Sequence, residues 1–466
     1  MKDILLLDKL KSLVEIDRSL SFNSQDPQIY RQRALLFQEL GCDALAKYDN
    51  RISAYLEKKE LEYYNQDYLP LLTQTEFEEK YQDEKHTHYY KIFFDILIND
   101  KAFSKEKLDP IYFALRSGNA TLLGLFNLAL RDCNDAMKYL EPFPQEYAIA
   151  TVNKAMLLLL IGDYATGWKL YEKRWETNYK SFENPMILPR PLWQGEQLNS
   201  QNRLLIKAEQ GIGDNIQFVR YAIYLKQQGI DVLVWNNEHI DDFLRENLTQ
   251  YGISTAKLGD SVHFTHWVRM MSLPYLCHTT LSNVPLTSKY LHSSKKYLQK
   301  WQTKLPLASQ KLKIGIVWRG NTLTDTDTLR SIPLSLFSQL FYLNAEFHVL
   351  QKEINQNEEK MLTNYSNVYD WHNELMSFSD TAAIIVQMDL ILCVDTSVAH
   401  LAAAMGKPTW ILINYKPDFR WLMIGEKSIW YESVKLFRQD LDYDWKPIIL
   451  RVKDDLDKKI NFHSIR

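Results

Sequence analysis

The chain has 466 residues, and its 55 Lys and Arg against 58 Asp and Glu leave a formal net charge of −3, so no basic surface for nucleic acid is indicated. A hydrophobic fraction of 46% argues against disorder, and the four cysteines have neither CxxC nor metal-ligand spacing. The first residues lack the apolar run of a signal peptide, and the longest apolar run, 155–161, is far below the ~18 residues of a membrane-spanning helix. We therefore expect a cytoplasmic protein without a transmembrane segment.

The first part of the chain is predicted to be helical. Apolar residues recur at three- and four-residue spacing around 30–56 and again around 147–175. Gly162 falls where a turn glycine ends one helix, and Gly167 allows the next helix to pack closely against it. The two stretches match position by position, and this pattern resembles the tetratricopeptide repeat (TPR). For 57–146 an ordinary helical bundle is an equal alternative.

The pattern of apolar residues changes after a linker with three prolines between 185 and 191, which exclude a continuing helix. Short apolar runs then alternate with amphipathic stretches, and the cycle restarts near residue 311. Alternation of this kind predicts parallel, doubly wound sheets in two α/β lobes, with ligands at the carboxyl ends of the strands. Strands are expected at 204–206, 231–235, 313–318, 347–350, 389–394 and 409–413, and helices at 215–228, 333–343, 380–388 and 397–405.

A glycine-rich loop follows the first expected strand. Gly211 and Gly213 are placed for close backbone approach to a ligand, and Asp214 follows them. The loop is not a dinucleotide fingerprint, because Ile216 stands at the third glycine position, and it is not a Walker loop. Asp214 is open to two interpretations, a helix N-cap or a general base that faces the cleft.

Two later clusters suit an anionic ligand. The strand that ends in Arg319, Gly320 and Asn321 places a cation and backbone amides at a strand's carboxyl end, and Arg330 follows shortly after. The alternative is a surface arginine in a turn.

The second cluster is Asp395, Thr396, Ser397 and His400, which runs from a strand into a helix. Thr396 and Ser397 are expected to cap that helix while its first amides bind an anion. A lone histidine on a helix is more often structural, so this site depends on the combination.

Two further patterns are interpreted as structural. The acidic triplet 325–327 lies in a polar loop and is expected to form a turn, although such triplets hold a metal in some sugar transferases. The run 263–266 alternates like a strand and lacks further ligands. No metal site is predicted.

Six motifs in a fixed order carry a family resemblance. Together they look like bacterial TPR glycosyltransferases, whose catalytic part is similar to ADP-heptose:lipopolysaccharide heptosyltransferases and more distantly to O-linked N-acetylglucosamine transferase. The resemblance covers roughly residues 150–450. The motifs are EQGIGDNIQFVRY at 209–221, IGIVWRGN at 314–321, RSIP at 330–333, LQK at 350–352, DTAA at 380–383 and VDTSVAHLAAAMGKP at 394–408.

The resemblance implies a GT-B fold of two Rossmann-like lobes behind a TPR-like domain. Asp214 matches the proposed base, Arg319 falls where heptosyltransferases use a lysine, and Ser397 stands where they commonly have glycine. The implied parts are a helical TPR-like domain at 1–180, an acceptor lobe at 181–310, a nucleotide-sugar donor lobe at 311–440 and a C-terminal helix at 441–466 that packs back on the first lobe. The implied donor-binding residues are Arg319, Asn321, Arg330, Gln351, Lys352, Asp395, Thr396, Ser397 and His400.

The implied function is an inverting, metal-independent transfer of a hexosyl or heptosyl group. The donor would be a UDP- or ADP-linked sugar used without a cofactor, and the acceptor a hydroxyl or amide on a protein or a cell-surface glycan. A protein partner on the TPR-like helices is expected, and nucleic acid is not. The alternative is a non-catalytic TPR scaffold with a degenerate transferase domain, which Asp214, Arg319 and His400 disfavour. A dehydrogenase is excluded by Ile216.

Overall fold

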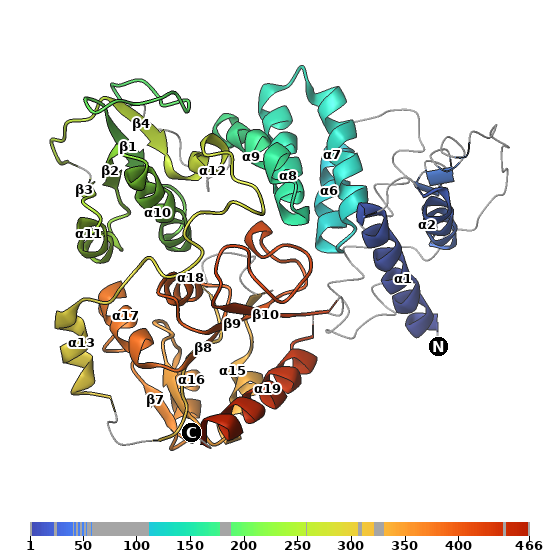
Figure 1. Cartoon of the computed structure of the whole chain (residues 1–466). Helices are drawn as coiled ribbons and strands as arrows, with labels where there is room; N and C mark the ends of the chain where they lie inside the picture. The colour runs from blue at the N-terminus through green and yellow to red at the C-terminus, as the bar shows by residue number, and fades with distance from the viewer. Residues whose placement is uncertain are drawn as a thin grey trace. The chain divides into compact units, whose positions relative to one another are not determined.

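The chain forms two compact units, Met1–Thr177 and Asn178–Arg466. The computed structural model (Figure 1) describes residues 2–22, 26–40, 42, 45–46, 49–50, 53, 57, 111–177, 188–257, 259–305, 310–320, 330–440 and 444–464. The described part of the first unit is helical throughout. Its elements are α1 (Lys2–Phe22), α2 (Pro27–Glu39), α6 (Ile111–Leu122), α7 (Phe126–Leu140), α8 (Pro144–Ile161), α9 (Tyr164–Tyr171) and η1 (Glu172–Glu176).

The α8–α9 pair has the turn that the sequence predicts. Gly162 ends α8 with a left-handed φ of 95°, and its N–H donates to the carbonyls at the end of that helix. Asp163 then caps α9 by accepting the Thr166 N–H at 3.1 Å. The described part of this unit is therefore helical, whereas its assignment as a TPR stays a prediction. Gly41, the expected turn of the first matched stretch, and residues 58–110, where further repeats would fall, lie outside the described residues.

Gly167 is the tightest point of this pair, and a side chain there is expected to destabilise the first unit. A Cβ at Gly167 would lie 2.7 Å from Leu159 Cγ and 3.1 Å from the Leu159 backbone N, and Leu159 is fully buried. Gly167→Val should cost roughly 1–3 kcal/mol by overpacking, measured as a shift in chemical unfolding followed by circular dichroism. Gly118→Val is the matched control, because a Cβ on that helical glycine meets nothing within 4 Å. Equal effects of the two substitutions would contradict the packing argument.

The second unit contains two sheets whose strands are all parallel. The first sheet has the order β3-β2-β1-β4, so β1 is a central strand that pairs with β2 on one side and with β4 on the other. Its short strands β3 and β4 were not predicted, because three or four residues carry no clear periodicity. The elements of this lobe are β1 (Arg203–Lys207), α10 (Ile212–Gln227), β2 (Asp231–Trp235), α11 (Asp241–Thr249), β3 (Ser254–Ala256), β4 (His266–Arg269), η2 (Met270–Ser272) and α12 (Leu273–Leu276).

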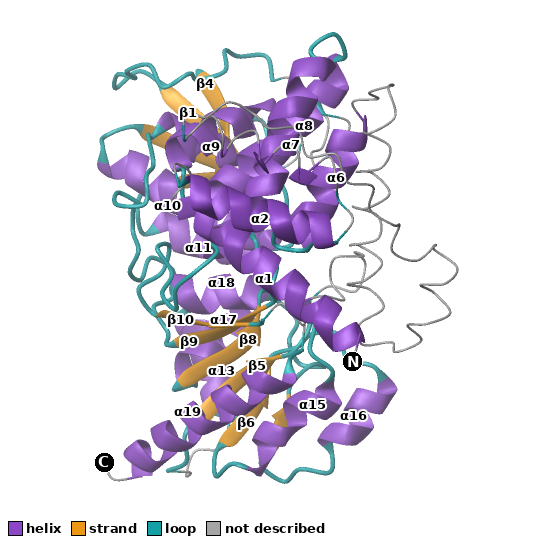
Figure 2. Ribbon diagram, turned by 90° about the vertical axis from the view of Figure 1, so that its right-hand side faces the viewer, coloured by secondary structure: helices purple, strands orange, loops and turns teal. Residues whose placement is uncertain are grey.

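The second sheet has the order β10-β9-β8-β5-β6-β7, and Figure 2 shows its strands side by side. The helix predicted at 333–343 is divided into α15 and the 3-10 segment η3, and β7 and β10 were not predicted. The elements are β5 (Lys313–Val317), α15 (Leu334–Phe337), η3 (Ser338–Tyr342), β6 (Glu346–Val349), α16 (Gln356–Leu362), β7 (Val368–Asp370), α17 (Phe378–Gln387), β8 (Leu390–Val394), α18 (Ser397–Ala404), β9 (Thr409–Ile413), η4 (Phe419–Trp421), β10 (Val434–Arg438) and α19 (Lys446–Ser464).

This order creates a switch point in each sheet. The strand β5 pairs with β6 on one side and β8 on the other, and β1 pairs with β2 and β4 in the same way. The chain leaves neighbouring strands toward opposite faces at such a point, which opens a crevice at their carboxyl ends. The loops after β1, β5 and β8 are those that carry the predicted chemistry.

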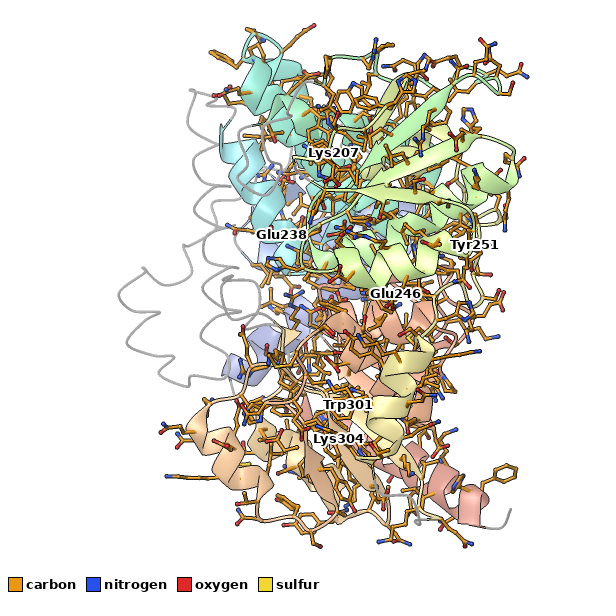
Figure 3. The ribbon with its side chains drawn as sticks, turned by 90° about the vertical axis from the view of Figure 1, so that its left-hand side faces the viewer. Lys207, Glu238, Glu246, Tyr251, Trp301 and Lys304 are labelled. Carbon is orange, nitrogen blue, oxygen red and sulfur yellow. The ribbon has the colours of Figure 1, made fainter. Side chains whose placement is uncertain are left out.

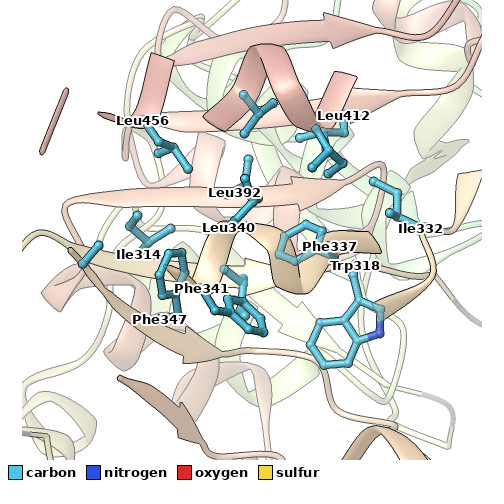
Figure 4. Packing of buried hydrophobic residues seen from close by; sticks show 14 of the residues in the cluster. Ile314, Trp318, Ile332, Phe337, Leu340, Phe341, Phe347, Leu392, Leu412 and Leu456 are labelled. Atoms are coloured by element: carbon cyan, nitrogen blue, oxygen red, sulfur yellow. The ribbon is translucent and has the colours of Figure 1, made fainter. Parts of the chain in front are cut away.

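The C-terminal helix corrects one expectation. We expected residues 441–466 to pack back on the first lobe, but α19 buries Ile449, Val452 and Leu456 in the hydrophobic core of the second lobe. Figure 4 shows Leu456 in the same cluster as Leu392 and Leu412 of the second sheet. The apolar stripe of α19 is satisfied there, because the sheet offers a wide aliphatic surface next to β10.

The segment before β5 also joins the second lobe rather than the first. α13 (Lys295–Gln302) packs against α17, and the buried Trp301 donates its indole N–H to Asp380 at 2.9 Å. Figure 3 labels Trp301 on this helix and Lys304 just after it, beside the second lobe. The passage between the lobes therefore comes earlier than the expected boundary at 310.

Candidate active site

A cleft of about 1220 Å³ lies between the two lobes of the second unit. Its first-lobe wall comes from the carboxyl ends of β1 and β2 and the start of α10. Its second-lobe wall comes from the segments after β5, β6 and β8 and from the turn after β9. Asn321 lies outside the described residues, as does the triplet 325–327. The predicted site residues that line the cleft are Gly211, Gly213, Asp214, Arg319, Arg330, Gln351, Lys352, Asp395, Thr396, Ser397 and His400.

Asp214 lies in the first turn of α10, two positions after its first residue. The N-cap is Gly211, and Asp214 Oδ2 accepts the Gly211 N–H at 2.9 Å. The loop enters this turn through Gln210, whose φ of 62° is left-handed. Asp214 is therefore not the N-cap itself, but its carboxylate satisfies the backbone N–H of the N-cap residue, as in a capping box. The structural and the functional interpretations of this residue are compatible.

A second partner of Asp214 comes from the opposite lobe. Arg420, in η4, donates to Asp214 Oδ1 and also to Asp418 Oδ1, the latter at 2.6 Å. Its guanidinium lies over the Phe419 ring, 4.4 Å from the centroid. Burial raises the pKa of Asp214, and the charge of Arg420 opposes that effect. A partly buried carboxylate with a raised pKa accepts a proton more readily than an exposed aspartate.

The amino ends of α10 and α18 meet at Gly213. A Cβ at Gly213 would lie 3.0 Å from His400 Cδ2 and 3.7 Å from Ser397 Cα. Only glycine permits this approach without displacing the histidine ring. Because a helix amino end carries unpaired N–H groups and partial positive charge, two such ends beside one cleft favour an anionic ligand.

The expected side-chain caps of α18 are absent among the described residues. Thr396 occupies the N-cap position with extended backbone, but its hydroxyl makes no capping hydrogen bond, and Oγ1 is buried without a described partner. Ser397 is the first residue of the helix rather than its cap. The first amides of α18 are therefore not satisfied by these two hydroxyls, which leaves them for a ligand.

His400 is buried behind the start of α18. Its Nδ1 lies 3.0 Å from the Tyr431 hydroxyl, and its ring stacks on Trp421 at 5.2 Å between centroids. Burial lowers the pKa of His400 well below its usual value, and the nearby Arg420 and Arg220 act in the same direction. His400 is therefore neutral at pH 7 and offers the cleft a polar ring rather than a charge.

Arg319 lies in the cleft wall with its guanidinium already paired. Nη2 donates to Glu358 Oε2 at 2.9 Å and to the Glu353 carbonyl at 2.6 Å, and the Arg319 backbone N–H donates to Gln351 Oε1 at 3.2 Å. Burial raises the pKa of Glu358. Hydrogen bonds from Arg319, Asn355 and Trp318 lower it by a larger amount, so the net pKa is below the usual value. The predicted donor cation is thus held by an ion pair with an acid that the sequence interpretation missed.

Asp395 is the carboxylate at the end of β8. Burial and the neighbouring Asp418 raise its pKa to about 6, while Arg330 and Arg420 lower it.

Lys352 is held by a backbone group rather than by an acid, because its Nζ donates to the His372 carbonyl at 3.2 Å. The cleft therefore brings the predicted cations to one wall, each with its own local environment.

Asp395→Asn is expected to change the pH dependence of stability. The folded carboxyl keeps its proton up to about pH 6, whereas the unfolded one loses it near 3.8, so the unfolding free energy of the wild type should fall as pH rises between these values. The variant lacks this loss and should become the more stable protein above pH 6, by roughly 2–3 kcal/mol for a shift of this size. Calorimetric unfolding between pH 4 and 7 measures it. A difference between the two proteins that does not vary with pH would contradict the assignment.

Sequence reasoning missed Arg420 and Asp418. Both lie in the segment Pro417-Asp418-Phe419-Arg420-Trp421, which follows β9. A signal was available, since charged residues among aromatics at a strand's carboxyl end mark a site in a parallel sheet. The partner of Arg420 could not be read, because Asp214 lies 206 positions away.

Two searches of the described residues were negative. No group of three or more His, Cys, Asp or Glu side chains in the described ranges could hold a metal ion. None of the described helices combines the length and the apolar character needed to cross a membrane.

Part of this site matches a known family. Residues 374–427 match the family model Glycosyltransferase family 9 (heptosyltransferase), and this segment contains Asp395, Thr396, Ser397, His400 and Arg420. This match supports the predicted glycosyltransferase over the non-catalytic scaffold, and it covers only 374–427 of the 466 residues.

Individual proteins are similar at low identity. Protein FlbA of Caulobacter vibrioides is 22% identical over 358 residues, which cover 71% of this chain and 58% of that protein, so the chain spans little more than half of its relative's length. The glycosyl transferase family 9 structure from Veillonella parvula is 9% identical, with a TM-score of 0.40, over 55% of this chain and 97% of that one. The E. coli ADP-heptose LPS heptosyltransferase II is 10% identical, with a TM-score of 0.40, over 56% and 99%.

A third structure extends over the first unit as well. The Thermobaculum terrenum O-GlcNAc transferase is 11% identical, with a TM-score of 0.26, and the comparison covers 98% of this chain and 94% of that one. At these scores the structural comparisons carry no argument about mechanism.

Proposed function

We propose that this protein is an inverting, metal-independent glycosyltransferase that uses a UDP- or ADP-linked hexose or heptose. The single observation that carries this proposal is the position of Asp214 beside the amino end of α18 in one cleft. One group accepts a proton, and the other binds an anion. These are the two requirements of sugar transfer from a nucleoside diphosphate.

The proposed reaction has one displacement step. Asp214 takes the proton of the acceptor hydroxyl, the oxygen attacks the anomeric carbon, and the bond to the diphosphate breaks with inversion. The nucleoside diphosphate leaves with the bonding electron pair, and its charge requires stabilisation. Fixed N–H groups of α18 and the cations Arg330 and Arg420 line the same cleft and would supply it.

The acceptor and the compartment are further parts of the proposal. We place the acceptor, a hydroxyl or amide of a protein or cell-surface glycan, on the first-lobe wall next to Asp214. The helical first unit would bind a protein partner, as helical arrays commonly do. A cytoplasmic site of action is supported by the four cysteines, which are thiols rather than disulfides in the structure.

A donor panel tests this function. The unfolding temperature is measured with UDP, ADP, GDP and CDP sugars. One nucleotide class should raise it, because a ligand that binds only the folded state stabilises that state. Arg319→Ala serves as the variant expected to weaken the shift by releasing Glu358 into the cleft. No shift with any donor would contradict the proposal.

Stereochemistry and metal independence need their own measurements. The anomeric configuration of the product, read by proton NMR, should be opposite to that of the donor. Transfer should persist at an unchanged rate in excess EDTA. Retention of configuration would reject the single displacement, and loss of activity that added Mg²⁺ or Mn²⁺ restores would reject metal independence.

A further inference from the structure

The Asp214–Arg420 pair is a charge contact that joins the two predicted substrate walls of the cleft. Asp214 stands on α10 of the first lobe, and Arg420 stands on η4 of the second. The side chain of Arg420 is 9% exposed and that of Asp214 is 17% exposed, so the pair is shielded from solvent. A shielded ion pair is stronger than a surface one and leaves a costly unpaired charge when it is broken without a replacement.

This pair occupies the base that the reaction needs. Asp214 Oδ2 accepts from the Gly211 N–H, and Oδ1 accepts from Arg420. An acceptor hydroxyl that approaches Asp214 would therefore meet a carboxylate whose two oxygens already have partners. The cation lowers the proton affinity of the carboxylate as long as it stays there.

Arg420 also borders the place proposed for the donor diphosphate. Its neighbour Trp421 stacks on His400 of α18, and Gly213, next to Asp214, adjoins Ser397 at the start of that helix. The described charged residues that line the cleft are balanced between the two signs. They are the cations Lys207, Arg319, Arg330, Lys352 and Arg420 and the acids Glu209, Asp214, Glu353, Asp395 and Asp418.

A diphosphate that enters this cleft competes with the acids for its guanidinium groups. A guanidinium forms bidentate hydrogen bonds with phosphate oxygens, and a diphosphate carries more charge than one carboxylate. Arg319 is held by Glu358 and by a backbone carbonyl on the far side. Arg420 is the cation whose release has a chemical consequence, because it uncovers Asp214.

We propose that Arg420 moves from Asp214 to the donor diphosphate, so that donor binding frees the base for the acceptor. This inference rests on the proposed function and adds an order to it. Asp214 and the donor diphosphate compete for one guanidinium. Donor binding then precedes productive acceptor binding, and the base becomes available only when a leaving group is in place, which limits wasteful chemistry before the donor is seated.

Nucleotide binding to four forms of the full chain tests the exchange. The affinity for ADP and UDP is measured by titration calorimetry for the wild type, Asp214→Asn, Arg420→Gln and the double variant. Asp214→Asn should bind the nucleotide roughly 5- to 10-fold more tightly, since asparagine keeps the Gly211 contact but competes less for the cation. Arg420→Gln should bind at least about 10-fold more weakly. In the double variant the tightening should be absent.

Controls keep the outcomes separate. Arg203→Gln and Asp231→Asn disrupt a more exposed Arg–Asp pair (N···O 3.3 Å) at the amino ends of β1 and β2, away from the cleft, and should leave binding unchanged. If Arg420→Gln unfolds, Arg420→Lys replaces it and should show a smaller loss of affinity. Tightening that is missing in Asp214→Asn, or that persists without Arg420, would overturn the exchange and leave the proposed function standing. A wild type that binds no nucleoside diphosphate would overturn both.

Discussion

Asp214→Asn should reduce sugar transfer by roughly 10²- to 10⁴-fold, the usual contribution of a positioned general base. Asparagine has nearly the shape of aspartate and can still accept the Gly211 N–H, so α10 keeps its capping contact. The loss should therefore appear in kcat, while Arg420 keeps its contact with Asp418 and so limits the fall in unfolding temperature. Initial rates with a saturating donor, together with thermal unfolding of the same samples, measure both quantities.

Asp231→Asn is the matched control for this variant. Asp231 is a half-exposed carboxylate on the same lobe, and its ion pair with Arg203 lies at the opposite ends of the strands. This control should retain full activity. Transfer that survives Asp214→Asn within a factor of two would assign proton removal to another group.

Gly213→Val should disable the site by steric means. A Cβ at Gly213 would stand 3.0 Å from the His400 ring, and that ring cannot retreat, because it stacks on Trp421 and contacts the Tyr431 hydroxyl. The amino ends of α10 and α18 would be pushed apart. We expect overpacking to cost roughly 1–3 kcal/mol of stability and transfer to fall by about 100-fold, since small misplacements of catalytic groups have effects of this size.

A second substitution identifies the cause. His400→Ala removes the ring that the introduced valine side chain would strike, so the stability cost of the glycine substitution should be much smaller in that background. Gly213→Ala should lie between glycine and valine. Thermal unfolding of the four combinations measures the coupling. A valine that is tolerated equally in both backgrounds would show that the helices do not meet as described.

The alternation of strands and helices was readable from the sequence because it follows local apolar periodicity. The strand predicted at 409–413 has those bounds in the structure, and 231–235 does as well. The short strands β3 and β7 were not found, since three residues have no period. Placement of α13 and α19 was wrong for a different reason. An apolar stripe shows that a helix packs, but not which lobe receives it.

The candidate site divides along the same line. The loops after β1, β5 and β8 could be predicted to meet, because the carboxyl ends of parallel strands share one edge of a sheet. The ion-pair partners of their side chains could not be predicted, because Arg319 pairs with Glu358, and Asp214 with Arg420, through contacts between segments far apart in the sequence.

The sequence alone determined the α/β alternation of the second unit and the gathering of its glycines and charges at strand ends. Strand alternation, helix periodicity and loop chemistry depend on residues that are close in the sequence, so they can be read without the tertiary structure. Only the tertiary structure decided which charges meet, because ion pairs depend on the distance between two lobes rather than on spacing in the chain. That distance placed Arg420 against Asp214, the contact on which the proposed exchange with the donor depends.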